Sequence, residues 1–251
     1  MKRHKFCYFI VIYLLILGGN PSLWGQTASP AKGQWINFPG DRETFLEVED
    51  NPSLNLRTQI TIEAWIYPRD LPQLPQSRWQ LVQKGKAYNL AIWRTAIPGE
   101  ILLEINTTIF IIKDGLNIGE WNHVGGAYDG QKGEAWFYVN GKAHRVEGVD
   151  QKELESKSPL KVGQQFDGGM DALRISKTVR YQGNYELPMK HFETDRHTVL
   201  LWNFENKKDA SKNENRFDVH GEGIQFVGTP FRSVEPVDKL TVAWGRMKNR
   251  D

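Results

Sequence analysis

The sequence predicts an all-β protein, built as a two-sheet antiparallel β-sandwich. The first observation is the alternation within residues 59–67, where apolar side chains at the even positions share one face of a strand. The second is residues 119–142, where two alternating segments end in Asp-Gly and Asn-Gly, which suit tight turns between antiparallel strands. The third is the succession of short strands between turn residues, which favours a sandwich or jelly roll. No long helical period interrupts this pattern.

Each expected strand is a short apolar or alternating run that stops near turn residues. The expected strands are residues 34–38, 44–49, 59–67, 79–83, 87–93, 101–105, 108–113, 123–128, 134–139, 159–163, 168–176, 198–204, 217–220 and 224–227. Four stretches between them have other predictions. These are a proline-containing loop at 69–78, a charged loop or short helix at 149–158, an irregular stretch at 181–191 and a polar loop at 206–215.

The N-terminus is predicted to be a secretory signal. A basic start precedes the apolar run 6–17, which is short for a membrane span. An uncleaved N-terminal anchor is the alternative. The expected organisation is a signal peptide at 1–25, a polar linker at 26–33, the sandwich domain at 34–232 and a C-terminal tail at 233–251.

Composition bounds the function further. The only cysteine, Cys7, lies inside the signal, so the exported chain would have no disulfide. The net charge of +2 gives no indication of nucleic-acid binding. No further apolar span follows the signal, so we expect an extracytoplasmic protein, in the periplasm, at the cell surface or in the medium. The 9 tryptophans could pack in the sheets or stack on sugars.

Several motifs follow one another along residues 34–228. They include Ile60-Thr-Ile-Glu-Ala-Trp65, Trp121-Asn-His-Val124, Tyr138-Val-Asn-Gly-Lys142, Pro159-Leu-Lys-Val-Gly163 and Leu200-Leu-Trp-Asn-Phe-Glu205. In this order they resemble the laminin G-like (LamG) domains of the concanavalin A-like class, which implies a jelly-roll sandwich of two curved antiparallel sheets. Two departures are Gly125-Gly126 in place of Ala-Gly and Asp-Ala-Ser-Lys-Asn at 209–213 in place of Asp-Ser-Ser-Gly-Asn.

The resemblance favours a non-catalytic binding or adhesion module. Its expected partner is a glycan or a cell-surface or matrix protein, with calcium as a candidate cofactor. One alternative is a glycoside hydrolase or lyase of the concanavalin A-like class, and another is a structural surface protein without a small ligand. Fold alone does not choose among them.

No catalytic residue is expected. Related hydrolases carry carboxylates in a Glu-x-Asp-x-Glu pattern on one strand, since retaining hydrolysis needs two carboxyl groups close together. Near an expected strand this chain has only Glu47-x-Glu49, so two solvated charges are the simpler interpretation. His123 is expected to be a hydrogen-bonded core residue, because no acid or nucleophile neighbours it in the sequence.

Aromatic side chains are the candidate ligand-binding residues. Strand parity puts Trp136 and Tyr138 on the face opposite their alternating apolar neighbours, which predicts an exposed sugar-stacking pair unless a loop covers them. Trp79 and Trp93 flank loops and are also candidates. Trp121 belongs to a resembling motif and is expected to pack.

Three aspartates are the candidate metal ligands. Asp171 shares the parity of apolar neighbours and is expected to point inward, where a carboxylate needs a partner. Asp41 lies in the first turn and Asp209 in the polar loop near the end of the domain. The LamG resemblance implies that such loops could meet at a calcium site, whereas backbone capping without a metal is the alternative for Asp171.

Overall fold

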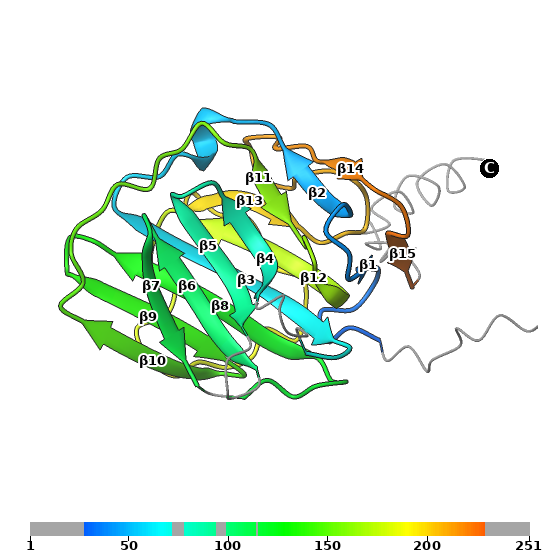
Figure 1. Cartoon of the computed structure of the whole chain (residues 1–251), viewed down its shortest axis with the longest axis horizontal. Coiled ribbons are helices and arrows are strands. Elements are labelled where there is room, and N and C mark those ends of the chain that lie inside the picture. The colour runs from blue at the N-terminus through cyan, green and yellow to red at the C-terminus, as the bar shows by residue number, and fades with distance from the viewer. Residues whose placement is uncertain (1–27, 72–77, 94–98, 114, 229–251) are drawn as a thin grey trace, which may run out of the picture.

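The computed structural model describes residues 28–71, 78–93, 99–113 and 115–228, which form two antiparallel sheets stacked face to face (Figure 1). Besides strands, this part of the chain contains a single 3₁₀ turn, η1 (Pro52–Leu54). It holds no helix with the length and apolar character needed to cross a membrane. The predicted all-β sandwich is therefore confirmed.

The first sheet, here sheet A, has the strand order β10-β9-β8-β3-β12-β1-β15, and β13 also pairs with β12. Its strands are β1 (Trp35–Pro39), β3 (Gln59–Pro68), β8 (Asn122–Asp129), β9 (Glu134–Val139), β10 (Lys142–Glu147), β12 (Asp167–Ser176), β13 (Thr198–Trp202) and β15 (Gln225–Val227). The turn between β9 and β10 uses Asn140 and Gly141, whose φ values of 49° and 84° suit the tight turn that this dipeptide predicts.

The second sheet, here sheet B, has the order β14-β2-β11-β4-β5-β6-β7. Its strands are β2 (Phe45–Val48), β4 (Arg78–Lys84), β5 (Tyr88–Trp93), β6 (Glu100–Ile105), β7 (Thr108–Ile112), β11 (Leu160–Val162) and β14 (Asp218–His220). Strands far apart in sequence alternate in this sheet, as β11 lies between β2 and β4. Neither sheet can therefore form from one contiguous segment.

The main core lies between the two sheets. Its buried members from β3 and β9 are Ile60, Ile62, Ala64, Ile66, Ala135, Phe137 and Val139. This confirms the predicted inward face of both strands. Each large apolar side chain moved out of water contributes about 1.5–3 kcal/mol, so burial of this core is a major stabilising contribution to the fold.

Most of the expected strands are confirmed, with boundary shifts of a few residues. Strand β10 was not expected, because its polar sequence lacks an apolar alternation. Residues 149–158 contain an isolated bridge at Leu154 and no helix. The described part of the expected linker packs on the domain, since Ser29 and Ala31 are buried. The predicted signal peptide at 1–25 and tail at 233–251 lie outside the described residues.

A bulge in β12 changes which side chains face outward. The register shifts between Asp171 and Arg174, and Ala172 has a φ of 48°. Met170 and Leu173 both belong to the core, whereas Ala172 joins a second apolar cluster on the outer side of sheet A. The bulge thus turns Asp171 toward the outer side, so its predicted inward direction is wrong although its burial is correct.

The segment 177–197 joins β12 to β13 and crosses the outer face of sheet A; we call it the strap. The Trp65 indole donates a hydrogen bond to the Pro188 carbonyl at 3.1 Å. The Tyr138 hydroxyl donates to the Tyr181 carbonyl at 2.6 Å. The strap is irregular, as predicted for 181–191, but side chains of the sheet hold its backbone in place.

Candidate functional site

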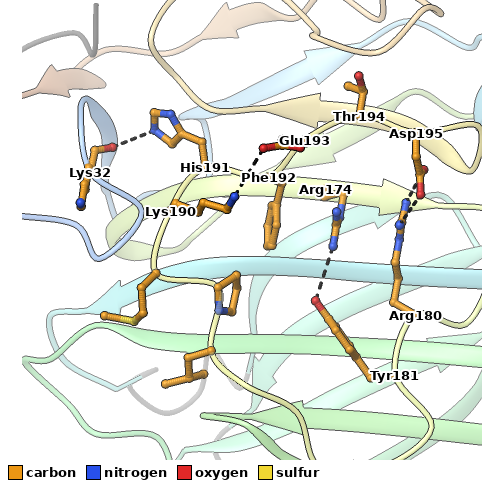
Figure 2. Close-up of a pocket in the computed structure, with 13 residues that line it drawn as sticks. Lys32, Arg174, Arg180, Tyr181, Lys190, His191, Phe192, Glu193, Thr194 and Asp195 are labelled. Atoms are coloured by element: carbon orange, nitrogen blue, oxygen red, sulfur yellow. Dashed lines mark hydrogen bonds and ion pairs between the residues drawn. The ribbon is translucent and has the colours of Figure 1, made fainter. Parts of the chain in front are cut away.

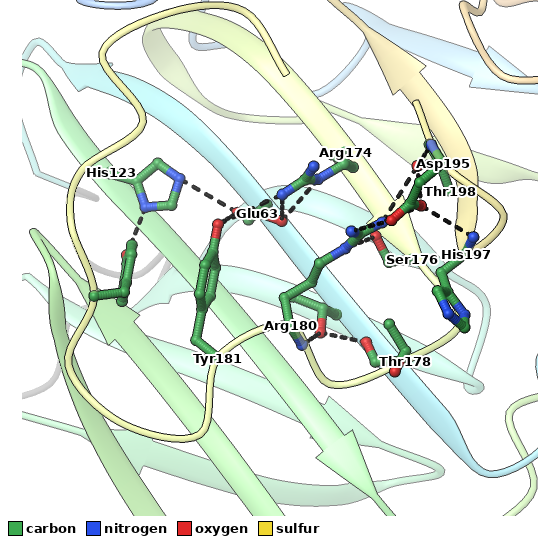
Figure 3. Close-up of polar contacts among 12 residues, drawn as sticks. Glu63, His123, Arg174, Ser176, Thr178, Arg180, Tyr181, Asp195, His197 and Thr198 are labelled. Carbon is green, nitrogen blue, oxygen red and sulfur yellow. Dashed lines mark hydrogen bonds and ion pairs between the residues drawn. The ribbon is translucent and has the colours of Figure 1, made fainter. Parts of the chain in front are cut away.

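A buried polar network lies between sheet A and the strap, formed by Glu63, His123, Arg174, Tyr181 and Tyr185 (Figure 3). Arg174 donates from Nε and Nη2 to Glu63 Oε1, at 2.9 and 2.7 Å. The Tyr181 hydroxyl donates to Glu63 Oε2 at 2.9 Å. The buried carboxylate is therefore paired with a charge and satisfied by hydrogen bonds, as burial demands.

His123 is fully buried, as expected, and its Nδ1 lies 2.6 Å from the Tyr185 hydroxyl. Its Nε2 is 3.5 Å from Glu63 Oε2 without hydrogen-bond geometry. Burial disfavours the ionised form of Glu63, but His123 and Arg174 outweigh that cost and hold the pKa of the Glu63 carboxyl below its ordinary value. The arrangement stabilises an ionised glutamate beneath the strap.

The expected exposed pair, Trp136 and Tyr138, is not exposed. Trp136 retains 7% of its surface and Tyr138 none, because Tyr181 and Tyr185 of the strap pack over them with Val179. Burial raises the pKa of all three tyrosines, so their hydroxyls stay neutral donors. The parity argument was correct about the outward face, and the covering loop, its stated alternative, is what the structure shows.

The other two candidate aromatic residues lie on sheet B. Trp79 is 6% exposed and packs in the core, with its ring centroid 5.7 Å from that of Phe166, so this residue is not at a surface. Trp93 is half-buried, and the Arg78 guanidinium lies 4.9 Å from its ring centroid. A ligand role for Trp93 stays a prediction.

The three candidate aspartates are not brought together. Asp41 accepts the Thr44 amide at 2.7 Å and so orders its own turn. Asp209 accepts the Leu201 amide at 2.9 Å together with three further hydrogen bonds inside its loop. Asp171 accepts the neighbouring backbone amide. Across the described ranges, no three His, Cys, Asp or Glu side chains are grouped to hold a metal, so these residues do not fit one calcium site.

The two carboxylates of the Glu47-x-Glu49 pattern have different surroundings. Glu47 extends from β2 toward Lys161 and His220, at 3.7 and 3.6 Å, while Glu49 is exposed beyond the strand end. A retaining pair would place two carboxyl groups about 5–5.5 Å apart across a ligand. Glu47 instead has two basic neighbours.

A pocket of about 730 Å³ opens beside the strap (Figure 2). Its lining residues are Lys32, Arg174, Arg180, Tyr181, Leu187, Pro188, Met189, Lys190, His191, Phe192, Glu193, Thr194 and Asp195. Both basic and apolar side chains contribute. Pockets of this size that combine apolar walls with a few polar groups commonly bind small ligands.

One side of the pocket is braced by an ion pair within the strap. Arg180 donates to both oxygens of Asp195, at 2.7 and 2.8 Å. The hydrogen bond from Arg180 holds the pKa of the Asp195 carboxyl well below its usual range. Arg180 also donates to Ser176 at the end of β12, which ties both limbs of the strap to sheet A.

An aromatic patch lies on the same outer face, formed by Trp35, Tyr67 and Trp121. The ring of Trp121 meets those of Trp35 and Tyr67 edge-on, with centroids 5.5 and 5.7 Å apart. Trp35 is buried, whereas Tyr67 and Trp121 are half-buried. Gly169 is required beneath them, because a Cβ there would come within 2.9 Å of the Trp35 ring and 3.1 Å of the Trp121 ring.

The patch has polar and apolar neighbours. Arg69 donates to Asn37 Oδ1 at 2.5 Å and pairs with Asp167. Trp121 also packs against the apolar cluster that contains Phe192, as does Leu187 of the strap. Trp121 of the patch and the pocket residues Leu187 and Phe192 thus belong to the same apolar cluster.

Sequence reasoning missed most of this surface. Glu63 and Arg174 occupy strands that are otherwise apolar, and a charge in such a strand signals a buried partner. That signal could have found the ion pair. The pocket gave no such signal, because Lys32, Arg174 and the strap meet only after folding.

The comparisons with known proteins agree with this architecture. A family model described as Laminin_G_3, concanavalin A-like lectin/glucanases superfamily, matches residues 40–184. No curated protein matched the sequence.

Two of the similar solved structures illustrate the range of relatives. One is a Bacteroides ovatus protein described as carbohydrate-binding, with 18% identity and a TM-score of 0.61 over 78% of this chain. This chain spans 60% of that protein's length. The other is the heptameric SAP-like pentraxin of Limulus polyphemus, with 14% identity, a TM-score of 0.56, and coverage of 81% of this chain and 98% of the pentraxin. At these identities the likeness concerns the fold alone.

Proposed function

The chain belongs to the concanavalin A-like lectin/glucanase superfamily, and from this premise we propose that it is an exported, non-catalytic module that binds carbohydrate. The observation that carries the proposal is the aromatic patch, in which Tyr67 and Trp121 are partly exposed and Trp121 packs against the cluster that contains Phe192 of the pocket. The C–H faces of sugars stack on such rings, and flanking polar groups fix the orientation. The Bacteroides ovatus neighbour, described as carbohydrate-binding, supports this ligand class.

The positions of the acidic side chains argue against a catalytic role. Glu63 is buried and neutralised by Arg174, and Glu47 has basic neighbours in place of a second carboxylate. A hydrolase would need an acid and a second carboxylate facing each other across the ligand. A calcium requirement stays a prediction, so binding is measured with and without that ion.

Affinity electrophoresis through gels that contain soluble polysaccharides tests the proposal. Tyr67→Ala and Trp121→Ala are each expected to weaken binding about tenfold, because each removes a ring from the stacking surface. Trp93→Ala is the matched comparison, since Trp93 is also half-buried but lies on sheet B. Unfolding curves verify that the variants remain folded.

Two outcomes would contradict the proposed site. If the folded Tyr67 and Trp121 variants bind as tightly as the wild type, the aromatic patch does not take part in carbohydrate recognition. Loss of binding in the Trp93 variant alone would move the ligand to the outer face of sheet B.

A second candidate function, recognition of a surface protein, is favoured by strand β7. This edge strand of sheet B exposes Ile109 and Ile111 by 39% and 38%. Apolar edge strands pair readily with strands of other chains. Ile109→Lys would abolish such an interaction and leave carbohydrate binding intact.

A further inference from the structure

Arg174 brings an unused donor group to the pocket. Its Nε and Nη2 are engaged by Glu63, and Tyr181 lies 3.4 Å from Nη2. The remaining Nη1 forms no hydrogen bond with any residue that the structure describes, and Figure 3 accordingly draws no dashed line to it. The side chain is only 10% exposed, yet it lines the pocket. A cation so nearly buried, with free N–H groups at a cavity wall, is a fixed donor for an anion.

The guanidinium is held rigidly in this position. Its Cζ lies 4.0 Å from the centroid of the Phe192 ring, and Glu63 fixes its other edge. The donor is therefore preorganised, so little conformational entropy would be lost when a ligand binds.

Lys32 supplies a second cation at the opposite side of the pocket. The His191 imidazole donates from Nε2 to the Lys32 carbonyl at 2.8 Å, which fixes the backbone there (Figure 2). The ammonium group of Lys32 has no ion pair with a residue in the described ranges, and the side chain is exposed.

The other charges around the pocket compensate one another. Arg180 is paired with Asp195, and Lys190 lies 3.4 Å from Glu193. Among the described lysine and arginine side chains of the lining, Lys32 and the free edge of Arg174 thus remain as cationic donors for a ligand.

We propose that this pocket binds an anionic substituent, carboxylate or sulfate, so that the module recognises an acidic glycan. The inference rests on the proposed carbohydrate-binding function and extends it. Leu187 and Met189 supply apolar surface at the same pocket, and Met189 is 56% exposed. An anionic sugar has the two complementary parts, a charged group for the cations and C–H faces for the apolar wall.

The test compares acidic with neutral polysaccharides by affinity electrophoresis of the full chain. The acidic probes are polygalacturonate, hyaluronate and chondroitin sulfate; carboxyl-reduced polygalacturonate and dextran are the neutral ones. Hyaluronate carries carboxylate alone and chondroitin sulfate carries both groups, so these two separate the anion types. We expect at least one acidic probe to bind, and carboxyl-reduced polygalacturonate and dextran to bind at least tenfold more weakly than that probe.

Lys32→Glu is the main variant, because its exposed side chain can change without disturbing the fold. It should weaken binding of the acidic probe about tenfold. Lys177→Glu is the matched control, with the same charge reversal on an exposed strap residue that does not line the pocket. Arg174→Lys keeps the charge but removes the guanidinium donors, and it should also weaken binding if its unfolding curve shows a folded protein.

The outcomes that would contradict the anion site, the pocket and the carbohydrate function differ from one another. Equal binding of acidic and neutral probes would overturn the anion site while leaving the carbohydrate function standing. Equal weakening by Lys32→Glu and Lys177→Glu would show that binding depends on general charge attraction. It would overturn the assignment of the anion site to this pocket. Binding to no probe would count against the carbohydrate function itself.

Discussion

Asp171 shows how strongly burial acts on a single residue. Its side chain has no exposed surface, and within the described ranges Oδ2 has no hydrogen-bond partner. Burial raises the pKa of this carboxyl to about 8, from 3.8 for an unperturbed aspartate. Between these two values the folded protein holds a proton that the unfolded chain has lost. Stability is therefore fully present at low pH and decreases as the pH rises toward 8.

Asp171→Asn is expected to remove this pH dependence, because the amide stays neutral. Thermal unfolding between about pH 5 and pH 8 should show a smaller fall in melting temperature for the variant than for the wild type. Asp218→Asn, at an exposed position, is the control and should keep the wild-type slope.

Repeating these melts with EDTA addresses calcium at the same residue. A melting temperature that falls with EDTA in the wild type, but not in the Asp171 variant, would assign the carboxylate to a cation. The inference that the Asp171 carboxyl is protonated in the folded protein would then be wrong.

At the scale of elements, the strap determines which side chains on the outer face of sheet A are accessible to solvent. It covers Trp136 and Tyr138 and leaves Tyr67 and Trp121 partly open. The strap has no regular secondary structure, so its order depends on side-chain contacts such as the Arg180–Asp195 pair. Segments of this kind open locally at a lower free energy than core strands.

Arg180→Ala is expected to loosen the strap without unfolding the sandwich. Hydrogen exchange should become faster in residues 177–197, while β3 and β8 keep their protection, because the main core is untouched. Arg196→Ala, an exposed strap variant outside the pocket lining, should leave exchange unchanged. Uniform acceleration across the whole domain would contradict a locally braced strap.

The strands could be predicted because alternation and turn residues are local signals. Ile60 and Phe137 each lie on the predicted face. The candidate site could not be predicted in the same way. The bulge at Ala172 reverses the local parity, and the strap covers Trp136 through contacts between residues distant in sequence. Parity indicates which face a side chain occupies, but it carries no information on what covers that face.

At the scale of the whole molecule, the two outer faces differ. The outer face of sheet A carries the strap, the pocket and the aromatic patch. Sheet B presents smaller stacked groups, such as Phe45 against His220 at 4.8 Å between centroids, and the apolar edge strand β7. The proposed carbohydrate function and the second candidate, protein recognition, therefore belong to different faces and can be separated by mutation.

The central claim is that this domain binds carbohydrate on the outer face of sheet A. A glycan array probed with the protein lacking residues 1–25, with and without calcium, tests it most directly. We predict a restricted set of hits, enriched in glycans with carboxylate or sulfate groups and lost in Trp121→Ala. A blank array from protein that melts cooperatively would contradict the claim and favour recognition of a surface protein instead.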